Sequence, residues 1–272
     1  MALYVPQNRY VIPFQQRSII SARYKAVTKA INVSLWNSSS DTTHSFYVGS
    51  YGRGTAIDTS DIDILVEVPQ SYYVTSTYTS YNVQSRLLQV VRNALLQVYP
   101  RSDISGDGQV VVIDFSDGTK FEVLPAISQQ DYWGRITYKY PDSHKGGRWM
   151  STNPKEEQRA MEVKNYTSNG LLFDTCKHMR YIRDNYYSTS YLSGIVIDAF
   201  VYAAIGSWRW TTPNSGRSAP NGKYESELLQ YYNERSWFGQ FDFSLTAPGS
   251  GDPVSTSGSL NCLGKVLATM TE

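Results

Sequence analysis

The stretch "GSYGRGTAIDTSDIDILVEV", residues 49–68, decides both how this chain begins to fold and where its chemistry is expected. Its second half alternates polar and apolar residues, which predicts a β-strand over residues 61–68. Because side chains alternate along a strand, Asp61 and Asp63 share one face while the isoleucines beside them point into the core. Two carboxylates about 5 Å apart repel by roughly 3 kcal/mol at an effective dielectric constant of 20. The pair is therefore expected either in open solvent on an edge strand or around a cation.

Two further features favour the cation. The turn at Gly49 and Ser50 has the backbone freedom for a close approach, and its amides with the Ser50 hydroxyl are predicted to hold phosphate oxygens. A third acid, Glu122, lies in the apolar stretch "TKFEVLPAI", and Asp114 on the preceding strand is the alternative third acid. Three carboxylates on one sheet face suit two Mg²⁺ or Mn²⁺ ions about 4 Å apart, the arrangement that serves in-line phosphoryl transfer.

Composition narrows the class of protein. With 41% hydrophobic and 18% charged residues, the 272-residue chain is a folded protein of one large domain or two small ones. Its 25 Lys and Arg against 24 Asp and Glu give a net charge of +1, which argues against a long nucleic acid as partner. Two cysteines and three histidines without a CxxC pair argue against a disulfide framework or a structural zinc site. We expect no secretory signal, no membrane segment and a cytoplasmic location.

The apolar periodicity changes along the chain. The first half predicts helices over residues 15–36 and 80–99, strands over 45–48 and 61–68, and a hairpin of "QVVVIDF" and "TKFEVLPAI" around an Asp-Gly turn. The segment "YPDSHKGGRW", residues 140–149, is expected to be a loop. The second half predicts helices over residues 154–166, 171–187, 190–205, 224–238 and 260–270. We therefore expect an α/β half followed by a mainly helical half.

These motifs resemble the polymerase-β-like nucleotidyltransferases, and more closely the branch of cGAS, oligoadenylate synthase and the bacterial CD-NTases (cGAS/DncV-like nucleotidyltransferases). The resemblance is carried by the Gly-Ser turn, Asp61-x-Asp63 and the acid in "FEVLPA", and by four later segments. These are "PDSHKGGRWMSTNPKEE", "CKHMRYIRDN", "STSYLSGIVIDAF" and "GDPVSTSGSLN". The resemblance implies an α+β fold of two parts. Residues 1–135 would form a nucleotidyltransferase core, built as a mixed sheet with helices, and residues 136–272 would form a helical nucleotide-binding half. The active cleft would lie between the two, and the N-terminal helix would pack across both.

The resemblance also implies roles for single residues. Asp61 and Asp63 would hold both metal ions, and Glu122, an Asp in many relatives, would complete the ion that activates the attacking hydroxyl. Gly49 and Ser50 would bind the β- and γ-phosphates of a nucleoside triphosphate. The helical half would supply four further nucleotide-binding residues: Lys177, Arg180, Ser190 and Asn165.

Each of these four has a plain structural alternative. Lys177 and Arg180, three residues apart on one helical face, would clamp the triphosphate or form a solvated basic face. Ser190 would contact phosphate or sugar, cap its helix, or do both. Asn165 would read a uracil edge or end its helix in the left-handed conformation. The helix after Ser190 carries Gly194 where relatives have Glu, which puts its base-side contacts in doubt.

The expected function is synthesis of a cyclic dinucleotide or oligonucleotide second messenger from nucleoside triphosphates, with a uridine-containing product. The family's bacterial members usually act in antiphage defence (CBASS), so the expected partner is a separate effector protein that the product switches on. One alternative is a linear nucleotidyltransferase that modifies a small molecule, a protein or a nucleic-acid end. A second is an inactive nucleotide-binding relative that acts through protein partners. A nucleic-acid sensor is disfavoured by the net charge and the few cysteines and histidines.

Overall fold

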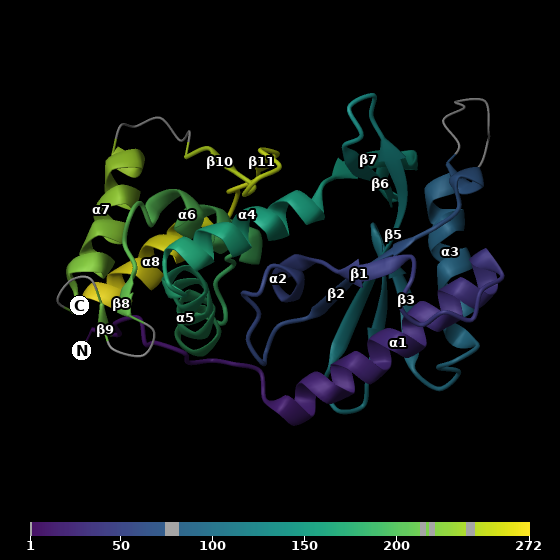
Figure 1. The fold of residues 1–272 in the computed structure, drawn as a ribbon, viewed down its shortest axis with the longest axis horizontal. Coiled ribbons are helices and arrows are strands. Elements are labelled where there is room, and N and C mark those ends of the chain that lie inside the picture. Colours follow the sequence, from purple (N-terminus) through teal and green to yellow (C-terminus); the bar gives the residue numbers. More distant parts are fainter. Residues whose placement is uncertain (1, 74–81, 213–215, 218–220, 238–242) are drawn as a thin grey trace. The chain divides into compact units, whose positions relative to one another are not determined.

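The computed structural model describes residues 2–73, 82–212, 216–217, 221–237 and 243–272 (Figure 1). The chain forms two compact units. One, which we call the sheet unit, comprises Pro13–Gly52 and Asp61–Asn153. The other, the helical unit, comprises Met1–Ile12, Arg53–Ser60 and Pro154–Glu272. The short segment that follows the glycine turn thus belongs to the helical unit, although the sequence on both sides of it belongs to the sheet unit.

The sheet unit is built on a mixed sheet that has seven strands within the described residues (Figure 1). The strand order is β1 (Ser45–Tyr47), β2 (Ile62–Glu67), β5 (Lys120–Gln130), β4 (Val110–Asp114), β3 (Asp103–Asp107), while β6 (Ile136–Asp142) pairs with β5 and β7 (Arg148–Thr152) pairs with β6. Strands β2 and β5 run parallel, and the other pairs of the sheet are antiparallel. The predicted α+β class with a mixed sheet is confirmed.

Two helices complete the core of the sheet unit. Helix α1 (Phe14–Trp36) and helix α3 (Val83–Leu96) contact each other and the sheet strands. The alternation predicted for β2 is present, because Ile62 and Ile64 are fully buried while Asp63 between them is partly exposed. Helix α3 begins at Asn82, whose side chain accepts a hydrogen bond from the Ser85 amide at 2.9 Å. The start of the helix predicted over 80–99 lies outside the described residues.

The predicted loop over residues 140–149 is wrong. It contains the end of β6, a short 3₁₀ turn over His144–Gly146 and the start of β7. The division expected after residue 135 therefore falls in the turn between two paired strands, β5 and β6. Pro141 is placed where β6 pairs with β7 but no longer with β5, so its missing amide costs the sheet little. The sheet unit accordingly extends to Asn153.

The helical unit contains the predicted helices with shifted ends. They are α4 (Pro154–Thr167), α5 (Leu171–Tyr186), α6 (Gly194–Ala204), α7 (Lys223–Trp237) and α8 (Leu260–Thr271). Two short strand pairs accompany them: β8 (Trp210–Thr212) with β9 (Gly216–Arg217), and β10 (Leu245–Thr246) with β11 (Pro253–Val254). The end of the helix predicted to reach residue 238 lies outside the described residues.

The N-terminal segment is divided between the two units. Residues Met1–Ile12 belong to the helical unit, where the Leu3 amide donates to the Thr269 carbonyl at 3.0 Å and Val5 is buried in the core. Helix α1, which follows, belongs to the sheet unit. None of the helices that the structure describes is long and apolar enough to cross a membrane.

Candidate active site

The three predicted acids lie on one face of neighbouring strands in the sheet unit. In the parallel pair of β2 with β5, Asp63 is level with Glu122, and Ile62 is level with Phe121. One residue earlier on each strand, Asp61 is therefore level with Lys120. Because residues that are level across two strands share a face, the four polar side chains form a two-by-two block on the face opposite the buried isoleucines. We call this block the acid face.

A lysine already neutralises part of the acid face. The Lys120 Nζ donates to Glu122 Oε1 at 2.5 Å and lies 3.5 Å from Asp61 Oδ2. The lysine side chain is 34% exposed, against 49% for Asp61 and 27% for Glu122. The cation therefore lies between two of the three predicted metal ligands, in a site that is open to water.

The pKa values of Asp61 and Lys120 are both raised, for different reasons. Burial raises the pKa of Asp61, and the negative charges of Glu122 and Asp114 raise it further, while Lys120 opposes them. The pKa of Lys120 is also raised, first by its hydrogen bond to Glu122 and then by the two carboxylates around it. The Asp61 shift thus comes first from burial, and the Lys120 shift comes from the carboxylates that surround its ammonium.

The glycine turn packs directly against this site. Residues Gly49–Gly52 form a single helical turn, α2, and the Val48 amide before it donates to the Asp63 carbonyl at 2.9 Å. A Cβ atom on Gly49 would lie 1.7 Å from Asp63 Oδ2, and the backbone there has a φ of +58°. Only glycine satisfies both conditions. The turn predicted to hold phosphate thus borders the carboxylate predicted to hold metal.

The alternative third acid occupies a different place. Asp114 on β4 is level with Lys120, whereas Glu122 is level with Val112. Asp114 therefore shares the acid face but lies beyond the lysine. Glu122, level with Asp63, is the better placed third acid.

The acid face suits divalent cations in its donor chemistry. Carboxylate oxygens are the ligands that Mg²⁺ and Mn²⁺ prefer, and the Lys120 ammonium marks a position that already attracts a cation. Among the described residues, no group of three or more His, Cys, Asp or Glu side chains is gathered closely enough to hold a metal ion. The carboxylates therefore have to converge further, and Lys120 has to leave, if Asp61, Asp63 and Glu122 are to share bound metal.

The predicted nucleotide-binding residues of the later chain all lie in the helical unit, where Arg180 forms a buried ion-pair network. Its guanidinium, 1% exposed, donates to both oxygens of Asp198 at 2.7 and 2.9 Å and to the Gly194 carbonyl at 3.0 Å. Arg53 donates to the same carboxylate at 2.9 Å and pairs with Glu157 at 3.0 Å. Burial alone would raise the pKa of Asp198, but the two arginines lower it to about 2.

This network speaks against the predicted contact of Arg180 with a triphosphate. The Arg180 guanidinium is enclosed by the Asp198 carboxylate and two backbone carbonyls. If the guanidinium moved to a ligand, it would leave the buried Asp198 without one of its two cations, which is costly. Lys177, on the same helix, is half-buried, and burial lowers its pKa. Lys177 therefore remains the better of the two candidates for a phosphate contact.

Asn165 and Ser190 have structural partners of their own. Asn165 lies within α4, and its Oδ1 accepts a hydrogen bond from the Phe173 amide at 3.0 Å, near the start of α5. It does not end its helix in the left-handed conformation; Asn169 does, with a φ of +53°. Ser190 is not the cap of α6, which begins after Ser193. It lines a groove of about 350 Å³ together with Arg183, Asp184, Ser188, Thr189, Tyr191 and Leu192.

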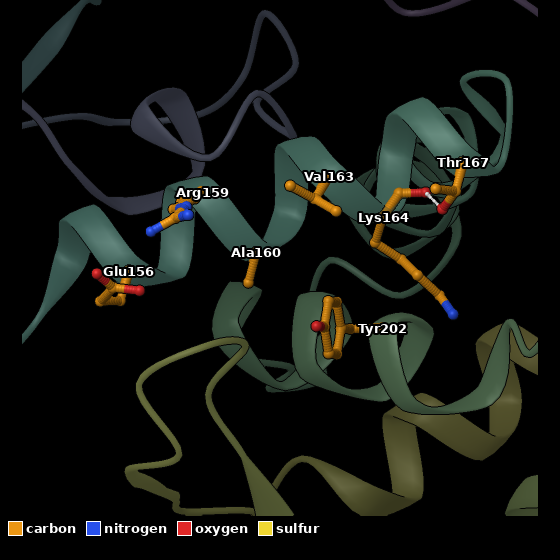
Figure 2. A pocket seen from close by; sticks show the side chains of 7 residues that line it. All are labelled: Glu156, Arg159, Ala160, Val163, Lys164, Thr167 and Tyr202. Carbon is orange, nitrogen blue, oxygen red and sulfur yellow. Dashed lines mark hydrogen bonds between the residues drawn. The ribbon is translucent and has the colours of Figure 1, made fainter.

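A second pocket holds none of the predicted residues. Figure 2 shows it on α4 and α6, with a volume of about 240 Å³. It is lined by Glu156, Arg159, Ala160, Val163, Lys164, Thr167 and Tyr202. One of its two cations, Lys164, donates a hydrogen bond to the Gly206 carbonyl at 2.9 Å.

Comparison with known proteins decides the family. The family described as "Second Messenger Oligonucleotide or Dinucleotide Synthetase domain", SMODS, matches residues 9–165, which is more than half of the chain. The chain belongs to the SMODS family. The resemblance to bacterial CD-NTases is thereby confirmed, and so is the predicted enzyme class, because this SMODS protein is a nucleotidyltransferase of the family that makes cyclic oligonucleotides.

Solved structures extend the similarity of the SMODS protein beyond the matched residues. The CdnE cyclic dinucleotide synthase of Elizabethkingia meningoseptica, solved with GTP and Apcpp, has a TM-score of 0.62 at 13% identity, covering 93% of this chain and 89% of that one. The CdnE c-di-GMP synthase of Capnocytophaga granulosa has a TM-score of 0.64 at 16% identity, covering 94% of this chain and 78% of that one. The CdnE c-UMP-AMP synthase of Rhodothermus marinus has a TM-score of 0.61 at 13% identity, covering 92% of this chain and 88% of that one. No curated protein sequence matches.

Sequence reasoning missed two ion-pairing residues of this SMODS protein, Lys120 and Asp198. Lys120 is two residues before Glu122, and that spacing alone places it on the same face of a strand. Its position beside Asp61 follows only from the register of β2 with β5. Asp198 was visible as the one acid in an apolar helix, a pattern typical of a buried ion pair. Nothing local to it identifies Arg53 and Arg180 as its partners.

Proposed function

We propose that this protein synthesises a cyclic dinucleotide or cyclic oligonucleotide from nucleoside triphosphates at the acid face. The observation that carries the proposal is the register that places Asp63 level with Glu122 and, one residue earlier, Asp61 beside Lys120. Acids on adjacent parallel strands, next to a turn that only glycine can make, form the kind of centre that two-metal nucleotidyl transfer requires.

The residues of the chain divide the work. Asp61, Asp63 and Glu122 would hold two Mg²⁺ or Mn²⁺ ions. When bound, such ions neutralise charge on the triphosphate and lower the pKa of an attacking ribose hydroxyl. Gly49 allows the backbone close to the carboxylates, and Ser50 with the neighbouring amides would hold the β- and γ-phosphates. The protein contributes position and electrostatics, because the nucleotide itself carries the bonds that form and break.

In the helical unit, we propose contacts to the nucleotide from Lys177 and Ser190. Lys177 is half-buried with a long side chain, and Ser190 lines an open groove. Asn165 is a weaker candidate, because the amide oxygen that would accept from the N3–H of uracil already accepts from a backbone amide. Arg180 we now assign to the structural network instead.

We propose further that the product contains uridine and acts on a separate effector protein in bacterial antiphage defence. The uridine proposal draws on one similar structure, the c-UMP-AMP synthase of Rhodothermus marinus, whereas the similar enzyme of Capnocytophaga granulosa is a c-di-GMP synthase. The effector proposal is supported by the family description, since a second messenger requires a receiver. No step of the chemistry depends on either proposal.

The test is a product assay. Purified protein is incubated with each α-³²P-labelled nucleoside triphosphate in the presence of the other three and Mg²⁺ or Mn²⁺, and then treated with phosphatase. Label that survives phosphatase lies in an internal phosphodiester, and mass spectrometry gives its bases and ring size. A linear product, or label transferred to another acceptor, would contradict cyclic synthesis and support the alternative of linear transfer. A wild-type level of product from Asp61→Ala/Asp63→Ala would contradict the site.

A further inference from the structure

Lys120 is positioned as if it belonged to the predicted metal site. It stands level with Asp61 across the β2–β5 pair and two residues before Glu122 on the same strand face. Its ammonium lies 2.5 Å from one of these carboxylates and 3.5 Å from the other. In the described part of the chain, neither carboxylate forms an ion pair with any other cation.

The charges make this lysine a competitor for cations. Three carboxylates bring a formal charge of −3 to the acid face, and Lys120 compensates one of them. An ammonium and a divalent cation cannot occupy the same carboxylate oxygens, because each requires them at contact distance. Lys120 must therefore leave Asp61 and Glu122 when these residues bind metal.

The structure also provides a place for the lysine to go. A third of its side chain is exposed, and its four-carbon stem is flexible. Directly across the β4–β5 pair lies the exposed Asp114, level with Lys120 on the same face. Residues that are level across an antiparallel pair are near enough to form an ion pair. The lysine can thus exchange partners by rotation of its own side chain.

We propose that Lys120 is a built-in counter-ion that partly neutralises the acid face without metal and lowers its affinity for divalent cations. The proposal rests on the function proposed above for the three acids. On this proposal, Lys120 leaves Asp61 and Glu122 and pairs with Asp114 when metal binds. The proposal also means that the enzyme requires a higher free concentration of divalent cation than its acids alone would.

The test measures metal binding without any turnover. Mn²⁺ is titrated into nucleotide-free protein, and free Mn²⁺ is measured by electron paramagnetic resonance. Lys120→Met removes the charge and keeps most of the side-chain volume. We expect it to bind Mn²⁺ roughly tenfold more tightly than wild type, the size of effect that two partly exposed ion pairs can exert. Lys120→Arg keeps the charge and should bind no more tightly than wild type.

Lys139→Met is the matched control. It removes the same charge from the same sheet, but Lys139 on β6 pairs with Ile127, well along β5 from Glu122. It should bind Mn²⁺ as wild type does. A second readout is thermal unfolding. In EDTA, Lys120→Met should melt below wild type, because its carboxylates repel one another without Lys120. Added Mn²⁺ should raise the melting temperature of Lys120→Met by more than that of wild type.

The outcomes separate this inference from the proposed function. Equal Mn²⁺ affinity in wild type and Lys120→Met, abolished in Asp61→Ala/Asp63→Ala, would overturn the role of Lys120 and leave the metal site standing. Tighter binding in Lys139→Met as well would also overturn it, since only net charge would then matter. Absence of Mn²⁺ binding in both wild type and Lys120→Met would overturn the metal site and the inference together.

Discussion

At residue 49, a hydrogen atom in place of a methyl group lets the backbone lie against the Asp63 carboxylate. The predicted Cβ contact of 1.7 Å is far inside any van der Waals distance, and Asp63 is itself fixed by the strand pairing of β2. The flexibility of the glycine is therefore less important here than its small size. The candidate site therefore depends on Gly49, although this residue has no functional group in its side chain.

Gly49→Ala should lower nucleotidyl transfer by at least about 100-fold, because it displaces either the turn or the carboxylate by an ångström or more. The matched control is Gly118→Ala in the β4–β5 hairpin, where φ is +84° but nothing lies within 4 Å of the added Cβ. Both changes strain the backbone, and only the first crowds the site. The measurement is product formation by proteins with matching circular dichroism spectra. Equal activity of the two variants would contradict the packing argument.

At this scale, the sequence was enough to select part of the candidate site. Asp61, Asp63, Glu122 and Gly49 were identifiable because each depends on local spacing or on a motif. Arg180 was assigned to a triphosphate because helical spacing shows a face but not its neighbour. Its partner Asp198 is eighteen residues away on another helix, and only tertiary packing brings the two together. Local patterns therefore predict which face of a helix is polar, but not which residues of other elements pack against that face.

Among the elements, the strands with strong alternation were predictable, and those with mixed patterns were not. Strand β2 alternates acids with isoleucines, so its face was readable. Strand β6 contains one proline, Pro141, and the turn from β6 to β7 contains Gly146 and Gly147, residues that favour a loop prediction. Their connection is fixed instead by Asp142, a buried carboxylate that accepts from Arg148 Nε and His144 Nδ1 at 2.8 Å. Such contacts are invisible to periodicity.

The Asp142 contacts predict an acid-dependent loss of stability. The hydrogen bonds from Arg148 and then His144 lower the pKa of Asp142 to about 2, below its usual value near 4. A carboxylate with a lowered folded-state pKa stabilises the fold fully above its unfolded pKa, and this contribution is lost as the pH falls from about 4 to about 2.

The check is the melting temperature between pH 2 and pH 6 for wild type and Asp142→Asn. We expect the variant to melt lower at pH 6 and the difference to shrink as the pH approaches 2. A difference that stays constant over this range would show that the charge of Asp142 contributes nothing.

At the scale of the whole molecule, the chain leaves the sheet unit between the two motifs of the site. Residues 53–60, which connect the glycine turn to Asp61, belong to the helical unit. Arg53 and Thr55 of this segment both donate to Asp198 Oδ2, at 2.9 and 3.0 Å. One fully buried carboxylate on α6 therefore holds the segment that joins the proposed phosphate-binding turn to the strand of the proposed metal ligands.

Asp198→Asn should lower the free energy of unfolding by about 3–5 kcal/mol, because two buried guanidinium groups would face the single charge of Glu157. Glu234→Gln on α7 is the control: it also neutralises one acid of the helical unit, but at an exposed position, and should change stability by less than about 0.5 kcal/mol. Urea unfolding measures both. A loss below about 1 kcal/mol in Asp198→Asn would contradict the structural role of the network.

The most direct measurement of the central claim is the anomalous scattering of Mn²⁺ in a crystal soaked with a non-hydrolysable nucleoside triphosphate. We predict anomalous peaks within coordination distance of Asp61, Asp63 and Glu122, with the triphosphate beside Gly49 and Ser50 and the Lys120 ammonium withdrawn from both acids. Nucleotide bound without Mn²⁺ at these carboxylates, or carboxylates turned away from one another into solvent, would contradict it.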